Sequence, residues 1–151
     1  MRVVIADDHS YYRRALARML RASGVDVVAE VGNGAAAVSA AGVTGADVVL
    51  MDIYMPGTSG AEAARAIARR SPGTAIVMLS VFAQEAEVVD AMVAGANGYV
   101  LKDRPVAEIV AAINAAAAGK PVVSPGIASA LLGRFRQTAR SDPRPALPAR
   151  S

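Results

Sequence analysis

The chain has 151 residues and no cysteine, which excludes disulfide bonds, zinc–thiolate centres and cysteine nucleophiles. Hydrophobic residues make up 54% of the sequence but aromatic residues only 4%, which predicts a core of aliphatic side chains and alanine. The net charge of +3 is unevenly distributed. Residues 1–120 hold 11 Lys or Arg and 12 Asp or Glu, whereas residues 121–151 hold 5 Arg and 1 Asp. Residues 1–120 therefore do not form a basic surface for binding nucleic acid.

Short apolar runs alternate with amphipathic stretches along the first 120 residues. In chain order, the predicted elements are strand 3–6, helix 11–23, strand 25–31, helix 35–41, strand 48–51, helix 61–70, strand 75–79, helix 85–94, strand 98–101 and helix 105–118. This alternation predicts a single doubly wound α/β domain, a five-stranded parallel sheet with helices on both faces. Right-handed crossovers favour the flavodoxin-like strand order 2-1-3-4-5. The second strand carries Asp26 and Glu30, so we expect it at an edge.

A C-terminal extension follows this main domain, which we assign to residues 1–120. Ser124 and Pro125 are typical of a helix start, and an apolar stripe follows them, so we predict a linker helix within residues 121–136. Residues 137–151 are rich in proline and arginine and predict a disordered linker or tail. No apolar run is long enough for a signal peptide or a membrane span, so we expect a cytoplasmic protein without membrane contact.

Polar side chains stand at the ends of four predicted strands. Asp7 and Asp8 follow the first strand, Asp52 the third, Ser80 the fourth and Lys102 the fifth. In the order 2-1-3-4-5 the first and third strands are neighbours at the topological switch point, so the three carboxylates converge there. They repel one another unless a cation joins them, and Mg²⁺ binds carboxylates together with phosphate oxygens and water.

This set of residues has the parts that phosphoryl transfer requires. Asp52 offers an oxygen nucleophile, and the polar residues of the neighbouring strands lie on both sides of it. Lys102 offers a cation for the phosphate oxygens, and Ser80 offers a hydroxyl donor. Each residue taken singly has a plain structural role open to it, as a helix cap or as a solvated lysine. The coincidence of polar residues at four strand ends favours the chemical interpretation.

The motifs at these positions resemble the receiver domain of two-component response regulators over residues 2–119. The resemblance rests on Asp7-Asp8, on Met51-Asp52-Ile53 followed by Met55-Pro56 and Gly60, on Ser80, and on residues 98–102. The sequence around residues 7–9 and 94–103 is similar to the branch that carries a C-terminal LuxR-type (NarL/FixJ-like) DNA-binding domain. Two departures are Ser80, where threonine is commoner, and Asp103, where many receivers have proline.

The resemblance implies a specific set of roles. A sensor histidine kinase would phosphorylate Asp52, and Lys102 would contact the phosphoryl group. Mg²⁺ would be held by Asp8, Asp52 and the backbone carbonyl of Tyr54, with Asp7 assisting through water. Ser80 and Tyr99 match the switch pair of the family. A homodimer is expected after phosphorylation, and DNA would be bound only through an effector domain outside residues 1–151.

Several alternatives stay open at this point. Residues 121–151 are too few for a LuxR-type domain, so the chain is either a piece of a transcription factor, which we favour, or a stand-alone receiver acting by protein contact. A Mg²⁺-dependent phosphohydrolase usually has a second acid where Tyr54 stands, and a nucleotide- or flavin-binding module would need a Gly-x-Gly-x-x-Gly turn. His9 is a candidate metal ligand, although a helix-start role is commoner. Bulky Tyr54 and Phe82 are predicted to crowd the hydrolytic water and slow the loss of the phosphoryl group.

Overall fold

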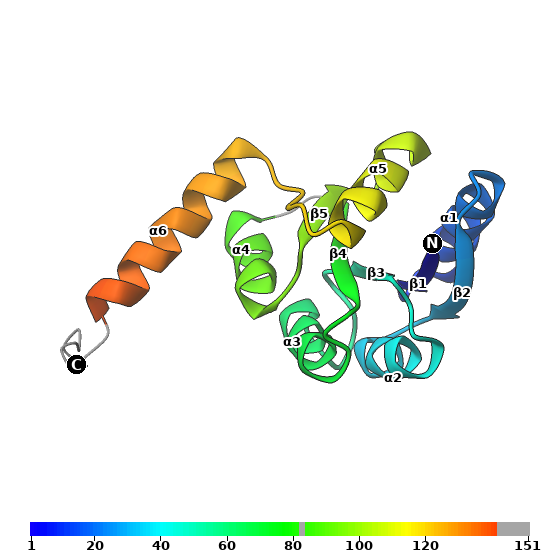
Figure 1. Cartoon of the computed structure of the whole chain (residues 1–151), viewed down its shortest axis with the longest axis horizontal. Coiled ribbons are helices and arrows are strands. Elements are labelled where there is room, and N and C mark those ends of the chain that lie inside the picture. The colour runs from blue at the N-terminus through cyan, green and yellow to red at the C-terminus, as the bar shows by residue number, and fades with distance from the viewer. Residues whose placement is uncertain (82–83, 142–151) are drawn as a thin grey trace.

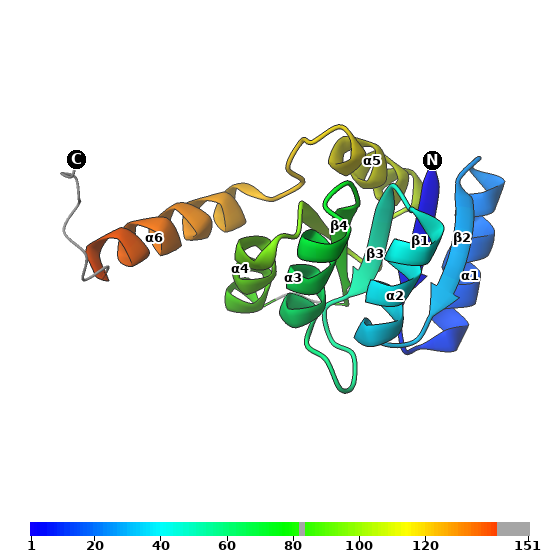
Figure 2. The same cartoon turned by 60° about the horizontal axis from the view of Figure 1, so that its bottom comes forward.

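The sheet has five parallel strands in the order β2-β1-β3-β4-β5, which confirms the predicted fold (Figures 1 and 2). The computed structural model describes residues 1–81 and 84–141. Its elements are β1 Arg2–Ala6, α1 Ser10–Ala22, β2 Asp26–Val31, α2 Gly34–Thr44, β3 Val48–Asp52, α3 Gly60–Arg70, β4 Ala75–Ser80, α4 Glu85–Ala94, β5 Gly98–Leu101, α5 Val106–Ala117 and α6 Pro125–Ser141. The acidic strand β2 lies at an edge, as expected.

The core consists of two apolar layers, one on each face of the sheet. Helices α1 and α5 cover one face through residues such as Leu16 and Ile113, and α2, α3 and α4 cover the other. Successive strand residues point to opposite faces, so Val3 and Ile5 contact the first layer and Val4 the second. The central strands are apolar in nearly every position because both of their faces are buried.

The turn after β3 is held close to the body of the domain. At Gly60, the first residue of α3, an added Cβ would lie 2.9 Å from the carbonyl oxygen of Ile53, so a larger residue would push the two segments apart. Ser59 and Glu62 form a capping box that satisfies backbone N–H groups at the start of α3. These contacts fix the path of the chain directly after Asp52.

Residues after α5 extend the structure at the β5 edge. Val122 pairs with Gly98, and its carbonyl accepts a hydrogen bond of 3.0 Å from the amide of Tyr99. Helix α6 then packs on α4, where Ile127 is buried and Arg134 forms an ion pair with Asp90. The rest of α6 projects beyond the domain (Figure 1).

The predicted end of α6 is wrong. We expected the helix to end by residue 136 and disorder to begin at residue 137, but α6 continues to Ser141. The reason is that residues 137–141 contain no proline or glycine, and the first residue in the tail that opposes a helix is Pro143. The expectation for residues 142–151 lies outside the described residues. No helix in the described part of the chain is long and apolar enough to span a bilayer.

Candidate functional site

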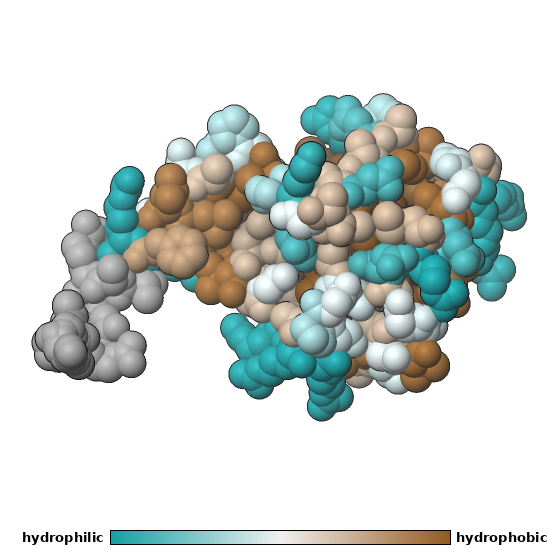
Figure 3. Space-filling view, viewed as in Figure 1, coloured by the Kyte–Doolittle hydropathy of each residue, from teal (hydrophilic) through white to brown (hydrophobic). Residues whose placement is uncertain are grey.

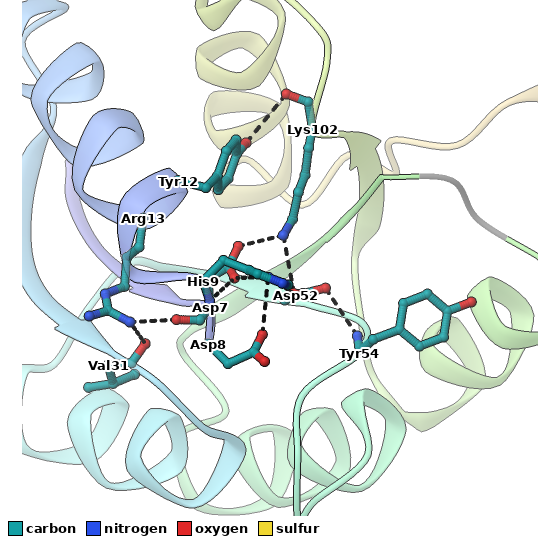
Figure 4. Close-up of polar contacts among 9 residues, drawn as sticks. All are labelled: Asp7, Asp8, His9, Tyr12, Arg13, Val31, Asp52, Tyr54 and Lys102. Atoms are coloured by element: carbon teal, nitrogen blue, oxygen red, sulfur yellow. Dashed lines mark hydrogen bonds and ion pairs between the residues drawn. The ribbon is translucent and has the colours of Figure 1, made fainter.

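The side chains from the strand ends meet at one edge of the sheet, as the topology predicts (Figure 4). Asp7 follows β1, Asp52 ends β3 and Ser80 ends β4, and all three are buried. Lys102 follows β5 and reaches back, so that its Nζ lies 2.6 Å from Oδ2 of Asp7 and 3.1 Å from Oδ2 of Asp52. The Lys102 amide donates to the Ser80 carbonyl at 2.7 Å, which anchors the start of this side chain beside β4.

Asp7 is held in place on both sides. Its Oδ1 accepts the backbone N–H of His9 at 2.8 Å, while Oδ2 faces the Lys102 ammonium. The guanidinium of Arg13, in the second turn of α1, donates to the Asp7 backbone carbonyl at 2.5 Å. Oδ2 accepts no hydrogen bond of good geometry among the described residues, so a buried oxygen of Asp7 has only a charge partner.

Asp52 is a buried carboxylate with its two oxygens in different surroundings. Oδ1 accepts the backbone N–H of Tyr54 at 3.1 Å, and Oδ2 faces Lys102. Burial raises the pKa of Asp52 above its ordinary value, because the charged form loses solvation. The Tyr54 amide and Lys102 act in the opposite direction, and the nearby charge of Asp7 adds to the increase. Asp52 is thus a poorly solvated carboxylate next to a cation.

Asp8 and His9 close the site on its solvent side. The His9 side chain is 68% exposed, and its Nδ1 lies 3.3 Å from Oδ1 of Asp7 and 3.3 Å from Oδ1 of Asp8. The same nitrogen lies 3.9 Å from Oδ2 of Asp52. His9 occupies the N-cap position of α1, but its side chain makes no capping hydrogen bond. The commoner helix-start role therefore does not account for the position of the imidazole.

The carboxylates fit a divalent metal ion. One donor atom from each of Asp7, Asp8, His9 and Asp52 can be chosen so that all lie within 4.8 Å of one another. Carboxylate oxygens in this number suit Mg²⁺, and the poorly satisfied Oδ2 of Asp7 is consistent with a further cation in the site. The predicted role of the Tyr54 carbonyl as a ligand stays a prediction, since only the Tyr54 amide has a contact to Asp52.

Tyr12 is a site residue that the sequence pattern does not indicate. The Lys102 Nζ lies 4.7 Å from the centroid of the Tyr12 ring, and the Tyr12 hydroxyl donates to the Lys102 carbonyl at 3.4 Å. Burial, with smaller contributions from Asp7 and Asp52, raises the pKa of Tyr12 to about 12, so the phenol stays neutral. In the sequence Tyr12 is simply an apolar position of α1. Arg13 is one of several arginines in that helix, and nothing in the sequence singles out its contact with the Asp7 carbonyl.

The side chain of Tyr54 points away from the carboxylates (Figure 4). Its hydroxyl donates a hydrogen bond to the Glu87 carboxylate on α4, and this bond is the main cause of a raised Tyr54 pKa. Tyr99 is half-buried and packs on the core layer that α2, α3 and α4 cover. Phe82 lies outside the described residues. No contact joins Tyr99 to the acidic residues among the interactions described.

Comparisons with known proteins identify the family of this chain. Residues 3–114 match the family model described as the response regulator receiver domain. The probable transcriptional regulatory protein NarL of Mycobacterium tuberculosis is 39% identical over 140 residues, which are 92% of this chain and 65% of that protein. The chain therefore spans less than two thirds of the length of this curated relative.

Solved structures show the same fold. The signal receiver domain of NarL from M. tuberculosis matches with a TM-score of 0.75 and 39% identity, covering 79% of this chain and 97% of that one. A LuxR-family two-component response regulator from an Aurantimonas species matches with a TM-score of 0.77 and 34% identity, covering 89% of this chain and 97% of that one.

The raised pKa of Asp52 predicts a cost in stability at neutral pH. The native state holds the Asp52 proton more tightly than the unfolded chain does, so stability falls as the pH rises from the ordinary pKa of 3.8 through the raised value. Asp52→Asn removes this cost. In metal-free buffer at pH 7 we expect it to raise the unfolding temperature, by about 3 °C for each kcal/mol relieved, with the gain fading toward pH 4.

Calorimetry or circular dichroism measures this effect. Asp103→Asn is the matched control, since the Asp103 side chain is 78% exposed and its neutralisation should leave the unfolding temperature unchanged. An Asp52→Asn protein no more stable than the wild type at pH 7 would contradict the prediction.

Proposed function

Because the chain belongs to the response regulator receiver domain family, we propose that Asp52 accepts a phosphoryl group from a sensor histidine kinase. The observation that supports this most is the buried Asp52 carboxylate, with Lys102 Nζ at 3.1 Å and further carboxylates beside it. An Asp52 oxygen attacks the phosphorus, the bond to the donor nitrogen breaks, and the donor imidazole leaves with its electron pair and takes up a proton. The products are an acyl phosphate and a free histidine.

The acidic residues hold Mg²⁺ in this proposal. Asp8, Asp52 and the Tyr54 carbonyl are the ligands, and Asp7 assists through water. When bound, Mg²⁺ supplies positive charge that offsets the repulsion between the carboxylates and the incoming phosphoryl oxygens. Asp7 also keeps Lys102 in the site, because its buried Oδ2 lies 2.6 Å from Nζ.

Lys102 and Ser80 act on the phosphoryl oxygens. The ammonium of Lys102 is already between two carboxylates before reaction, so neutralising the added charge requires little reorganisation of the site. Ser80 ends β4 beside Asp52 and supplies a hydroxyl donor. The chain catalyses only its own phosphorylation and dephosphorylation. Tyr54 stands where a phosphohydrolase usually has its second acid, which disfavours the phosphohydrolase alternative.

Phosphorylation then shifts a population rather than creating a new fold. The phosphoryl group draws Ser80 toward it, and Tyr99 turns into the space that Ser80 leaves. The surface that changes comprises α4, β5 and α5, and the phosphorylated chain forms a homodimer. Two surfaces are candidates for the dimer: the helices α1 and α5, or the face formed by α4, β5 and α5.

The wider function is that of a transcriptional regulator. LuxR-family and NarL-like relatives support an effector domain that binds DNA, with the receiver domain of residues 1–120 acting as its phosphorylation-controlled part in the cytoplasm. The alternative is a stand-alone receiver that acts through protein contact. The two differ in whether the natural gene product continues beyond residue 151.

Mg²⁺-dependent phosphorylation of Asp52 tests this proposal directly. Wild-type protein incubated with acetyl phosphate and Mg²⁺ should gain one phosphoryl group by mass spectrometry. Asp52→Asn should abolish this gain, and Asp8→Asn should weaken Mg²⁺ affinity by about tenfold or more and slow the reaction. A phosphoryl group on His9 or Ser80 with Asp52 unmodified would overturn the assignment.

Tyr99→Ala tests the switch. This variant should be phosphorylated at the wild-type rate, because Tyr99 has no contact with the acidic residues among those described. It should lose the phosphorylation-dependent NMR shift changes across residues 85–117, whereas the conservative Tyr99→Phe should keep most of them. If the NMR chemical shifts of residues 85–117 in the wild type do not change on phosphorylation, the switch hypothesis is wrong.

The phosphorylated form is expected to be long-lived. Tyr54 stands two residues after Asp52 and Phe82 two residues after Ser80, the two positions from which a short polar side chain could orient the attacking water, and neither residue has such a side chain. The Tyr54→Asn, Phe82→Glu double variant should lose the phosphoryl group about tenfold faster in Mg²⁺, which is about 1.4 kcal/mol of barrier.

The control for this decay measurement is Tyr54→Phe, which introduces no short polar side chain and should decay at the wild-type rate. Decay no faster in the double variant would mean that these two side chains do not control access of water.

A further inference from the structure

We propose that His9 is an additional ligand of the divalent metal and adds affinity for Mn²⁺, Ni²⁺ and Zn²⁺ but not for Mg²⁺. The inference rests on the metal site of the proposed function and assigns a specificity-determining residue within it. In Figure 4 the imidazole lies over the carboxylates, with dashed lines from its Nδ1 to the acids. The site would then bind transition-metal ions through its oxygen ligands and one ring nitrogen.

The distances around His9 are those of donors that share one metal ion. A metal with donors at about 2.1 Å separates neighbouring donors by roughly 3.0 Å in octahedral and 3.4 Å in tetrahedral geometry. The Nδ1 of His9 lies 3.3 Å from an oxygen of Asp7 and 3.3 Å from an oxygen of Asp8. Its 3.9 Å separation from Asp52 Oδ2 is only somewhat longer. A small movement of an exposed side chain therefore completes the set.

Other roles for this imidazole are poorly supported. The side chain is 68% exposed, so it is not a packed core residue, and it makes no capping hydrogen bond to α1. The His9 amide, which donates to Asp7 at 2.8 Å, directs the chain so that the ring lies above the acids. The remaining alternative is that the ring only makes a hydrogen bond between Nδ1 and Oδ1 of Asp7, at 3.3 Å, and balances the carboxylates, and it makes a different prediction for metal binding.

The donor chemistry explains the selectivity. Mg²⁺ takes oxygen ligands in a strict octahedron and keeps several waters, so an imidazole adds little to its binding. Imidazole suits Zn²⁺ and Ni²⁺, and affinities for nitrogen-containing sites rise along the series from Mn²⁺ to Ni²⁺. With His9 as a ligand, the same acidic residues bind Mg²⁺ through oxygen alone and the transition-metal ions through oxygen and nitrogen.

The composition of the chain leaves His9 as the one side chain that can supply an imidazole ligand. His9 is the only histidine, and there is no cysteine, so no other side chain offers a neutral imidazole or a thiolate. A histidine signal from a bound metal ion can therefore come only from His9. The protein must be free of any histidine tag, and the full chain of 151 residues is the sample.

The experiment compares His9→Gln with wild type by isothermal titration calorimetry using MgCl₂, MnCl₂, NiCl₂ and ZnCl₂. Glutamine keeps a polar oxygen of similar reach but no ring nitrogen. We expect the dissociation constants for Ni²⁺ and Zn²⁺ to rise about tenfold or more, and that for Mg²⁺ to change far less. Pulsed EPR of bound Mn²⁺ should show a ¹⁴N coupling in wild type that disappears in His9→Gln.

Two controls separate the possible outcomes. Asp8→Asn should weaken all four ions, and thermal unfolding should show that both variants are folded. Mg²⁺ binding with unchanged Ni²⁺ and Zn²⁺ affinity in His9→Gln, or no ¹⁴N coupling in wild type, would overturn the role of His9 alone. Equal tightening of all four ions in His9→Gln would show that the imidazole only balances the carboxylates, and equal weakening would show that it adds no selectivity; either result would also overturn the proposal. Failure of all four ions to bind wild type would overturn the metal site of the proposed function as well.

Discussion

Lys102 lies between two buried carboxylates that belong to different strands, and the arrangement of the site depends on this contact. Its Nζ is 2.6 Å from Asp7 and 3.1 Å from Asp52, although the lysine follows the edge strand β5 and the acids follow β1 and β3. Buried carboxylates repel each other and lose solvation, and a cation between them offsets both effects. Tyr12 covers this ammonium from the α1 side.

The contact with Lys102 does not fully offset the cost of burying the Asp52 carboxylate. Burial still raises the pKa of Asp52 in spite of Lys102, so the charged carboxylate is stabilised less than it would be in water. A site built for stability alone would use an uncharged residue at this position. On its open side, where Asp8 and His9 lie, the carboxylate cluster has too little positive charge to balance it, and a divalent metal ion would supply that charge.

A series of polar contacts leads from the site toward the C-terminal helix. Oδ1 of Asp52 accepts the Tyr54 amide, and the Tyr54 hydroxyl binds Glu87 at the start of α4. Further along α4, Asp90 pairs with Arg134 of α6. The segment that precedes α6 pairs with β5 through Val122 and Gly98. Helix α6 is therefore attached to the two elements, α4 and β5, that lie next to the site.

The sequence by itself determined the fold, the edge position of β2 and the group of residues at the strand ends. These features depend on local patterns, because strands and helices follow short-range periodicity and parallel strands bring their carboxyl ends to one edge. The tertiary structure alone decided which side chains touch. Tyr12 reaches Lys102 across 90 positions, Asp90 reaches Arg134 across 44, and Tyr54 reaches Glu87 across 33. Such contacts depend on how helices pack on the sheet and on side-chain directions, and no periodicity encodes them. The same is true of His9, whose ring lies over the carboxylates only because β1 and β3 are adjacent.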